Sequence, residues 1–568
     1  MNDEPPEPND QEIEATLCTV DCINACRFEE ILGNVSELPV GSLESLTMSL
    51  LSHLPENESP RVISVKPELP APTPLRGNGT KLLQNADQPV YDPAVVYVLE
   101  LATILALRDE ETITALGSDV ADALQAVTRD ADRLHPVALS RTVFYLLSLL
   151  RASNDHKYIR TPVVLHAISS FKQDLLKQCA LPILKGIQGC ISGPLELKKE
   201  MSSSPDFWAV MHALLPHPEA APLVLQIVEA VAEGPSAAIT ADNYEPAIQL
   251  LNALATAGSV GARQEQQREQ VPRRANQQQQ QTEKEKKPQT PEAVARASAA
   301  LSVVSSLASR VPTFIQHSHL ETEEAWRAYW SPVFRCLSTQ CVNPCREIRS
   351  KAFGLLQRCL QSPQLASTDH KEWTNIFGEV LFPLINQLLK PEVYQTDPGG
   401  MSETRVHAAQ LLCKIFLHYL DLLKEWDGES ELWTSILDIM DRFMNSGQND
   451  TLVEAVPESL KNVLLVMSSG GHLVPTSEKP DEQTPQQRKI WTETWTRLER
   501  FLPGLIPELF PGAQKEATPA PAAAAAPAAA PAATAAPSDN NVAENGETEA
   551  ASPTTSEPAA ATNETKDT

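Results

Sequence analysis

Cysteine and histidine are the side chains of this sequence that could hold a metal ion, and they form two groups. In the first group, Cys18, Cys22 and Cys26 are four residues apart, so a helix would carry them on one face. A zinc site needs a fourth ligand and usually closer pairs in loops, and no histidine follows nearby. We therefore expect these thiols to pack as small buried hydrophobic side chains, with metal binding as the alternative.

The second group is the densest set of potential ligands in the chain. It consists of Cys336, Cys341, Cys345 and Cys359, with His317 and His319 upstream. The spacings match no common zinc module. Cys336 and Cys359 also fall on apolar faces of expected helices, and free cysteine is usually buried. We therefore favour core packing and assign no metal ligand.

Motifs for other kinds of chemistry do not occur in the sequence. There is no phosphate-binding glycine loop of either common spacing, no Gly-x-Ser-x-Gly turn and no His-Glu-x-x-His pair. The basic cluster at residues 284–287 lies in a polar stretch, where a solvated run is the simpler interpretation. We predict no catalytic, cofactor-binding or metal-binding residue and no cofactor. An enzyme with an unrecognised site is the least favoured reading.

Composition narrows the class of protein further. The chain has 568 residues, 46 of them proline, and a formal net charge of −27. Such an acidic chain is a poor binder of nucleic acid, because phosphates need Lys and Arg to displace their counterions. The first residues are acidic, and no run approaches the roughly 20 apolar residues that span a bilayer. We expect the ten cysteines to be reduced in the cytosol.

An internal repeat is the strongest structural signal. Residues 347–356 and 403–412 share Glu, Arg, Ala, Leu and Leu at a constant offset of 56. Each copy follows a helix-like segment with an embedded proline, Pro332 or Pro383. Paired helices that recur at intervals of about 40–50 residues are typical of HEAT or armadillo repeats, which stack into a solenoid. The expected fold is therefore all-α, a HEAT/armadillo-like helical-repeat solenoid with disordered linkers and a disordered tail.

Two arginines occupy equivalent positions in the repeat. We expect Arg349 and Arg405 to pair with a neighbouring carboxylate or carbonyl between helices and so to hold the register of the repeats. Contact with a partner protein is the alternative for both. Seven tryptophans are concentrated in the same block and should mostly pack between helices: Trp326, Trp330, Trp373, Trp426, Trp433, Trp491 and Trp495.

Changes in composition divide the chain into folded blocks and linkers. We predict disorder at 1–10, a helical segment at 11–54, a proline-rich linker at 55–93, a helical-repeat block at 94–260, a disordered Gln- and charge-rich linker at 261–291, a second helical-repeat block at 292–511 and a disordered Ala/Pro-rich tail at 512–568. Within the blocks, Asp206 is expected to cap a helix that begins at Phe207. Gly447 and the Gly470-Gly471 pair are expected to stop two others.

The second block carries motifs that can be compared with a known family. These are Trp326-Arg-Ala-Tyr-Trp-Ser-Pro332, Val380-Leu-Phe-Pro-Leu384, Gly399-Gly-Met-Ser-Glu-Thr-Arg405, Leu432-Trp-Thr-Ser-Ile-Leu-Asp-Ile-Met-Asp441 and Val456-Pro-Glu-Ser-Leu-Lys-Asn-Val-Leu-Leu-Val-Met467. Their order resembles the C-terminal region of the large Golgi-specific brefeldin A-resistance guanine-nucleotide exchange factors for Arf GTPases. The resemblance is strong over about 320–511, moderate over 94–257 and weak before that.

The resemblance implies a role without catalysis by these residues. In that family a separate helical domain performs exchange with the glutamate of a Phe-Arg-Leu-Pro-Gly-Glu loop, and this sequence has no such loop. Phe501-Leu-Pro-Gly504 echoes it but lacks the Arg and the Glu. The implied function is a non-catalytic regulatory and targeting scaffold in Golgi vesicle trafficking, cytoplasmic and peripherally bound to Golgi membranes. The implied partners are Arf-pathway GTPases or their regulators and other parts of the exchange factor. The alternative is a free-standing α-solenoid adaptor without an exchange role.

Overall fold

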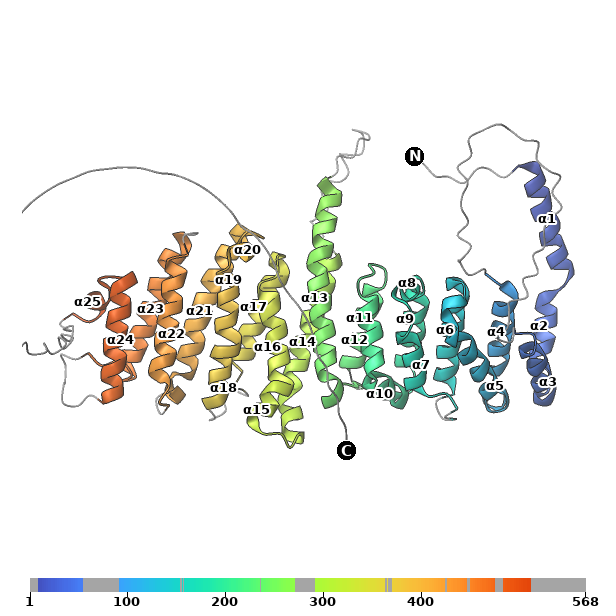
Figure 1. Cartoon of the computed structure of the whole chain (residues 1–568), viewed down its shortest axis with the longest axis horizontal. Coiled ribbons are helices and arrows are strands. Elements are labelled where there is room, and N and C mark those ends of the chain that lie inside the picture. The colour runs from blue at the N-terminus through green and yellow to red at the C-terminus, as the bar shows by residue number, and fades with distance from the viewer. Residues whose placement is uncertain are drawn as a thin grey trace, which may run out of the picture. The chain divides into compact units, whose positions relative to one another are not determined.

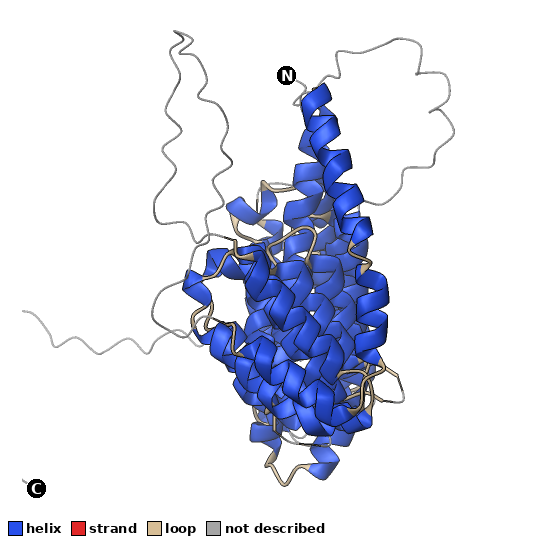
Figure 2. Cartoon of the chain, turned by 90° about the vertical axis from the view of Figure 1, so that its right-hand side faces the viewer, coloured by secondary structure: helices blue, strands red, loops and turns tan. Residues whose placement is uncertain are grey.

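The computed structural model describes residues 9–54 and 91–511, apart from short gaps and one longer gap. The gaps are 154–155, 157, 235, 271–291, 363–364, 366–369, 424–425, 447–449 and 476–483. Every regular element among the described residues is a helix (Figures 1 and 2). The prediction of an all-α fold is therefore confirmed. The segments predicted to be disordered lie mostly outside the described residues, so their disorder stays a prediction.

The predicted segment 11–54 contains three helices, and the first of them contributes nothing to the core. Helix α1 (Asp10–Ala25) begins with a capping box between Asn9 and Glu12, and it has no buried residue. Helices α2 (Phe28–Ser36) and α3 (Val40–Leu51) follow, and α3 packs on the next two helices with Leu43 fully buried. The N-terminal edge of the core is thus at α3.

The first block is a succession of helices, each packed on neighbours that lie near it in sequence (Figure 1). Helix α6 packs on α9, and α9 packs in turn on α12. The helices of this block are α4 (Pro93–Ala106), α5 (Glu110–Arg129), α6 (Pro136–Ala152), α7 (Thr161–Ser169), α8 (Gln173–Gln178), α9 (Ala180–Ile191), α10 (Leu195–Ser203), α11 (Pro205–Leu214), α12 (Ala221–Ala232) and α13 (Ala241–Gln270).

One expected helix cap in this block is wrong. Helix α11 begins at Pro205 rather than Phe207, so Asp206 lies inside its first turn. Its carboxylate instead accepts a hydrogen bond of 2.6 Å from the Ser169 hydroxyl and lies 3.3 Å from His166 Nδ1, both on α7. Proline suits the first turn of a helix, where its missing N–H costs nothing, and this moved the start upstream.

The second block has the same hairpin arrangement. Helix α16 packs on α17 and α19, α17 packs on α21, and α22 packs on α24. Its elements are α14 (Glu292–His317), α15 (Thr322–Ala325), η2 (Trp326–Trp330), α16 (Ser331–Cys341), α17 (Arg346–Leu360), α18 (His370–Asn375), η4 (Ile376–Leu381), α19 (Phe382–Leu388), α20 (Pro391–Tyr394), α21 (Pro398–Leu423), α22 (Glu429–Met444), α23 (Asp450–Ser469), α24 (Pro485–Phe501) and α25 (Leu505–Leu509).

Helix α13 joins the two blocks. It continues to Gln270, ten residues beyond the predicted end of the first block, and packs extensively on α14 and α16. Gly258 of α13 allows a close approach, because a β-carbon there would lie 2.5 Å from the Ala297 side chain of α14. The buried hydrophobic side chains of both blocks form one continuous cluster. The two helical blocks therefore share a core.

Helix α23 ends as its two glycines predict. Gly471 has a φ of 77°, which a side chain would disfavour. The amide of Gly471 donates to the Ser468 carbonyl, and the amide of His472 donates to the Met467 carbonyl. This is the Schellman pattern of helix termination. The other expected stop, Gly447, lies outside the described residues.

Two described helices, Glu292–His317 and Pro398–Leu423, are long and apolar enough by length and composition to cross a membrane. The expectation that no segment reaches this length was therefore too strict. Both helices pack into the core, which buries 39% of the most apolar window of the first and 56% of that of the second. A core helix of a helical stack passes the same test, so the apolar faces are explained by packing.

Candidate functional site in the repeated unit

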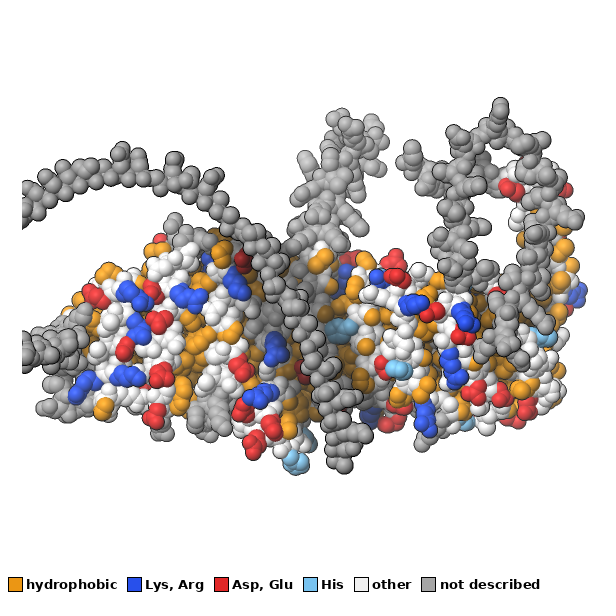
Figure 3. Space-filling view, in the orientation of Figure 1, with side chains coloured by type: hydrophobic (Ala, Val, Ile, Leu, Met, Phe, Trp, Pro, Cys, Tyr) orange, Lys and Arg blue, Asp and Glu red, His pale blue; other side chains and the backbone are white. Residues whose placement is uncertain are grey.

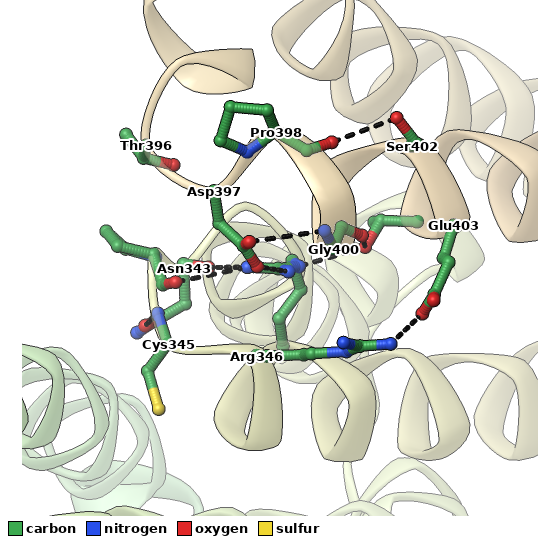
Figure 4. Close-up of polar contacts among 12 residues, drawn as sticks. Asn343, Cys345, Arg346, Thr396, Asp397, Pro398, Gly400, Ser402 and Glu403 are labelled. Atoms are coloured by element: carbon green, nitrogen blue, oxygen red, sulfur yellow. Dashed lines mark hydrogen bonds and ion pairs between the residues drawn. The ribbon is translucent and has the colours of Figure 1, made fainter. Parts of the chain in front are cut away.

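Arg349 links two successive units of the stack. Its side chain, from α17, is 1% exposed, and its guanidinium lies 2.5 Å from a carboxylate oxygen of Asp397, just before α21. Nε donates to the Thr404 hydroxyl at 2.9 Å, and Nη1 donates to the Asn343 carbonyl at 2.7 Å. Figure 4 shows Asn343, Asp397 and Gly400 in this cluster. Burial acts to raise the pKa of Asp397, but hydrogen bonds from Arg349 and the Gly400 amide hold that pKa below its ordinary value.

Arg405 occupies the equivalent position in the next unit but has different contacts. It is fully buried, its Nε donates to the Leu388 carbonyl at 2.8 Å, and its guanidinium lies 4.4 Å from the centroid of the Tyr394 ring. Burial lowers the pKa of Arg405. The expectation that both arginines pair with a carboxylate or carbonyl between helices is confirmed. Arg349 binds a carbonyl of the turn that follows α16, whereas Arg405 binds the carbonyl of Leu388, the last residue of α19.

A buried polar chain extends this arrangement back to the first block. The amide of Gln340, on α16, donates to Asn252 Oδ1 and to the Thr256 hydroxyl of α13, both at 2.8 Å. The side-chain oxygen of Gln340, Oε1, accepts a hydrogen bond of 2.7 Å from the side-chain amide of Asn343. The main-chain carbonyl of Asn343 in turn accepts from Arg349. Polar groups of α13, α16, α17 and α21 are thus satisfied by one another, which favours a single register of these helices.

The two embedded prolines follow helical turns of an unusual kind. Elements η2 and η4 are π-helical, and the amides of Ser331 and Phe382 donate to carbonyls five residues back, at Trp326 and Phe377. Proline has no amide hydrogen, and its ring clashes with the carbonyl four residues before it. The wider turn relieves this clash at Pro332 and Pro383 without breaking either helix. The prediction of a helix with an embedded proline is confirmed in both copies.

A groove of about 580 Å³ lies between these two proline-containing helices. It is lined by Arg327, Ser331, Phe334, Arg335, Ser338, Thr339, Glu379, Val380, Pro383, Leu384 and Gln387. Both π-turns contribute to its walls, through Arg327 from η2 and Glu379 from η4. The Glu379 carboxylate accepts a hydrogen bond of 3.0 Å from the indole of Trp326, which ties the two walls together.

None of the cysteines of the second group lines this groove. Cys336 and Cys341 are buried, and Cys345 and Cys359 are half-buried. Burial raises the pKa of Cys336 to about 12 and that of Cys359 to about 11, so both stay protonated at neutral pH and are poor nucleophiles. Within the part of the chain that the structure describes, no three His, Cys, Asp or Glu side chains gather as metal ligands.

The prediction for the first cysteine group is wrong. Cys18, Cys22 and Cys26 are exposed, because α1 buries none of its side chains. Helical spacing placed them on one face as expected, but that face has no packing partner among the described residues that would bury it. The seven tryptophans behave as predicted: six are buried and Trp426 is half-buried against the core.

Two features of this region were not identified from the sequence. The first is the groove itself. The sequence feature that could have pointed to it is the proline that follows an aromatic or apolar segment in both copies of the repeat. The second is a buried pair in which His472 Nδ1 lies 2.5 Å from a Glu429 carboxylate oxygen, with both side chains under 5% exposed. The helix stop at Gly471 places His472 there, so a closer reading of that stop could have suggested a buried neighbour.

The fold and this region define a class: an all-α protein of stacked helical hairpins. Residues 330–505 match the family model described as "GBF1-like, tetratrico peptide repeat region". That description names a different helical repeat from the HEAT or armadillo type expected, although all three are stacks of helical hairpins. The residues involved cover most of the strongest resemblance expected from the sequence.

Curated relatives agree with the family match. The chain is 36% identical over 183 residues to a Caenorhabditis elegans protein named "Golgi-specific brefeldin A-resistance guanine nucleotide exchange factor 1 homolog". The matched stretch is 32% of this chain and 9% of that protein. It is 30% identical over 186 residues to the "ARF guanine-nucleotide exchange factor GNOM" of Arabidopsis thaliana, covering 32% of this chain and 12% of GNOM. The chain thus matches only about a tenth of the length of these relatives. The expected resemblance to Arf exchange factors is confirmed for this region.

A third relative is similar over more of the chain. An uncharacterized protein of Schizosaccharomyces pombe is 23% identical over 526 residues, which is 89% of this chain and 33% of that protein. Among solved structures, a "circular tandem repeat protein" is aligned at 15% identity over 73% of this chain and 97% of its own, with a TM-score of 0.29. That score is too low to support an argument about the fold.

Proposed function

We propose that this chain forms a non-catalytic regulatory and targeting scaffold of an Arf guanine-nucleotide exchange factor that acts in Golgi vesicle trafficking. The observation that carries the proposal is the match of residues 330–505 to the GBF1-like family, supported by relatives named as Arf exchange factors. Its site of action would be cytoplasmic, peripherally on Golgi membranes. Its partners would be Arf-pathway GTPases or regulators and other parts of the exchange factor.

The described geometry supports binding rather than catalysis. The two buried arginines of the repeated unit are engaged in the packing of the helices, Arg349 with Asp397 and Arg405 with the Leu388 carbonyl, and the buried Cys336 thiol is protonated. Stacked helical hairpins present long surfaces made of many short helices, which suits the simultaneous binding of several partners. The chain would therefore act by positioning a catalytic domain. That domain would carry the Phe-Arg-Leu-Pro-Gly-Glu loop, which this sequence does not contain.

Nucleotide exchange on a myristoylated Arf GTPase tests this function. The assay compares this chain with the same chain joined to the coding sequence directly upstream of it. We expect exchange with the longer protein alone, and we expect it to be lost when the glutamate of the catalytic loop is replaced. Activity in neither protein would favour the adaptor without an exchange role. Activity of this chain alone would contradict the proposal.

A further inference from the structure

The groove between α16 and α19 has the features of a binding site for a peptide. Its floor is apolar and buried, formed by Phe334, Val380 and Leu384, and its exposed rim carries Arg327 and Arg335. We propose that this groove binds an acidic segment of a partner protein, with carboxylates on the rim arginines and one apolar side chain on the floor. This inference goes beyond the scaffold role and does not depend on Arf exchange.

The charges of the rim favour an acidic partner. Among the described residues, Arg335 makes one polar contact, a long hydrogen bond of 3.4 Å to the Ser331 hydroxyl of its own helix. Arg327 is ion-paired with Glu323, but its side chain is 70% exposed and such surface pairs contribute little. The lining also holds one carboxylate, Glu379, which keeps its charge while it accepts a hydrogen bond from the Trp326 indole. Arg335 is therefore the guanidinium open to an incoming carboxylate, and Arg327 can join it by exchanging Glu323 for the ligand.

The next unit carries a further exposed arginine near α19. Arg442 of α22 donates to Asn386 of α19 at 2.5 Å, and neither residue lines the groove. Figure 3 shows basic, acidic and hydrophobic side chains mixed over the face that α16 to α24 present. Salt screens exposed charges beyond about 8 Å at physiological ionic strength. The charges near the groove therefore act on an approaching peptide more strongly than the net charge of −27 does.

An unused hydroxyl in the groove is an independent sign of a ligand. The Ser338 hydroxyl oxygen is buried, and no hydrogen-bond partner for it lies among the described residues. A buried polar group without a partner costs free energy, and such groups in native structures call for an explanation. Ser338 is one of the residues that line the groove. A main-chain carbonyl or a carboxylate of a bound peptide would satisfy it.

The shape of the groove favours a protein segment over a membrane surface. Its volume of about 580 Å³ lies within the range of about 300–1,000 Å³ that is usual for sites that enclose a ligand. A flat bilayer could reach the exposed rim arginines but not the buried floor residues. An acidic segment that places one Leu or Phe on the floor would use both, in the way that anchored peptides bind grooves.

Peptide display on the purified full-length chain is the first test. A random peptide library is selected on this chain and then counter-selected on the Arg335→Glu variant. We expect the enriched peptides to combine at least two acidic residues with one apolar anchor. Enrichment of neutral or basic peptides, of peptides that bind both chains equally, or of none at all would overturn the proposal.

Affinities of the selected peptides then locate the site. By fluorescence anisotropy we expect Arg335→Glu to weaken binding at least about tenfold, and Ser338→Ala about fivefold. The matched control is Arg358→Glu on α17, which reverses an exposed arginine outside the groove and should leave affinity unchanged. Replacing the peptide's glutamates with glutamine should also abolish binding. Equal binding by Arg335→Glu and by the control, or Arg335-dependent binding of phosphatidylserine vesicles without peptide binding, would contradict the proposal.

Discussion

Arg349 and Arg405 lie 56 residues apart at the same position of the repeated unit, and both are buried, yet they are stabilised in different ways. Both donate to a carbonyl of the chain that leads into their own helix, Arg349 in the turn after α16 and Arg405 at the last residue of α19. Arg349 also reaches Asp397 and Thr404 in the next unit, whereas Arg405 stacks on Tyr394 within its own unit. The shared contact closes each hairpin, and only the first arginine additionally joins one hairpin to the next.

The largest expected effect is that of Arg349→Ala. Removing this side chain leaves a cavity, the Asn343 and Pro344 carbonyls without their donor, and an acidic group that has lost its counter-ion. Breaking a fully buried ion pair costs about 3–5 kcal/mol. Asp397 is 31% exposed and stays partly solvated, so we expect the lower end of that range, about 3 kcal/mol, and a clear fall in the melting temperature. Differential scanning fluorimetry measures it, with the exposed Arg358→Ala as a control that should change little. A stable Arg349→Ala protein that failed to reach membranes would instead indicate partner contact.

A smaller loss is expected for Arg405→Ala. This arginine closes its own hairpin through the Leu388 carbonyl and rests on the Tyr394 ring, so its removal disturbs one unit rather than two. We expect about 2–3 kcal/mol. Thermal melting of the two alanine variants side by side sharpens the comparison. An effect of Arg405→Ala equal to or larger than that of Arg349→Ala would show that the link between units adds nothing.

Two adjacent glycines test how tightly the ion pair is packed. A β-carbon at Gly400 would lie 2.0 Å from the Asp397 carboxylate and 2.3 Å from the Arg349 guanidinium, whereas one at Gly399 meets nothing within 4 Å. We therefore expect Gly400→Ala to cost about 2 kcal/mol, although alanine is the better helix former. Gly399→Ala should be neutral or stabilising by about 0.5 kcal/mol. Similar melting temperatures for the two variants would mean that the ion pair moves aside easily.

Sequence reasoning was sufficient for the fold but not for the site. Helical periodicity and the repeated Glu-Arg-Ala-Leu-Leu pattern predicted an all-α stack and the role of both arginines, because the local spacing determines which side chains face the core. It could not predict that Asp397 rather than another acidic residue would meet Arg349. That pairing depends on how the turn before α21 is placed, which is a matter of three-dimensional packing.

The groove and the exposed cysteines both depend on contacts between helices, which helical periodicity in the sequence does not predict. The prolines were visible at Pro332 and Pro383, but the π-turns that open a groove beside them follow from how each helix relieves a clash. Cys18, Cys22 and Cys26 were placed on one helical face correctly, yet burial needs a second element to pack on that face. The periodic spacing of residues predicts which side chains share one face of a helix, but it does not predict which element packs on that face.

The smallest expected effect is the pH dependence of the ion pair. The pKa of Asp397 is held below its ordinary value, so the unfolded chain takes up this proton at a higher pH than the folded one. The pair then contributes fully above the unfolded pKa of about 3.9, and its contribution is lost as the pH falls through the lower folded pKa. We expect Asp397→Asn to cost about 1 kcal/mol at pH 7 and progressively less below about pH 4. Melting temperatures of both proteins between pH 7 and pH 3 measure this. A difference that stayed constant or grew on acidification would mean that the Asp397 carboxylate is not ionised in the folded protein. Arg349 and Arg405 would then differ less than their contacts indicate.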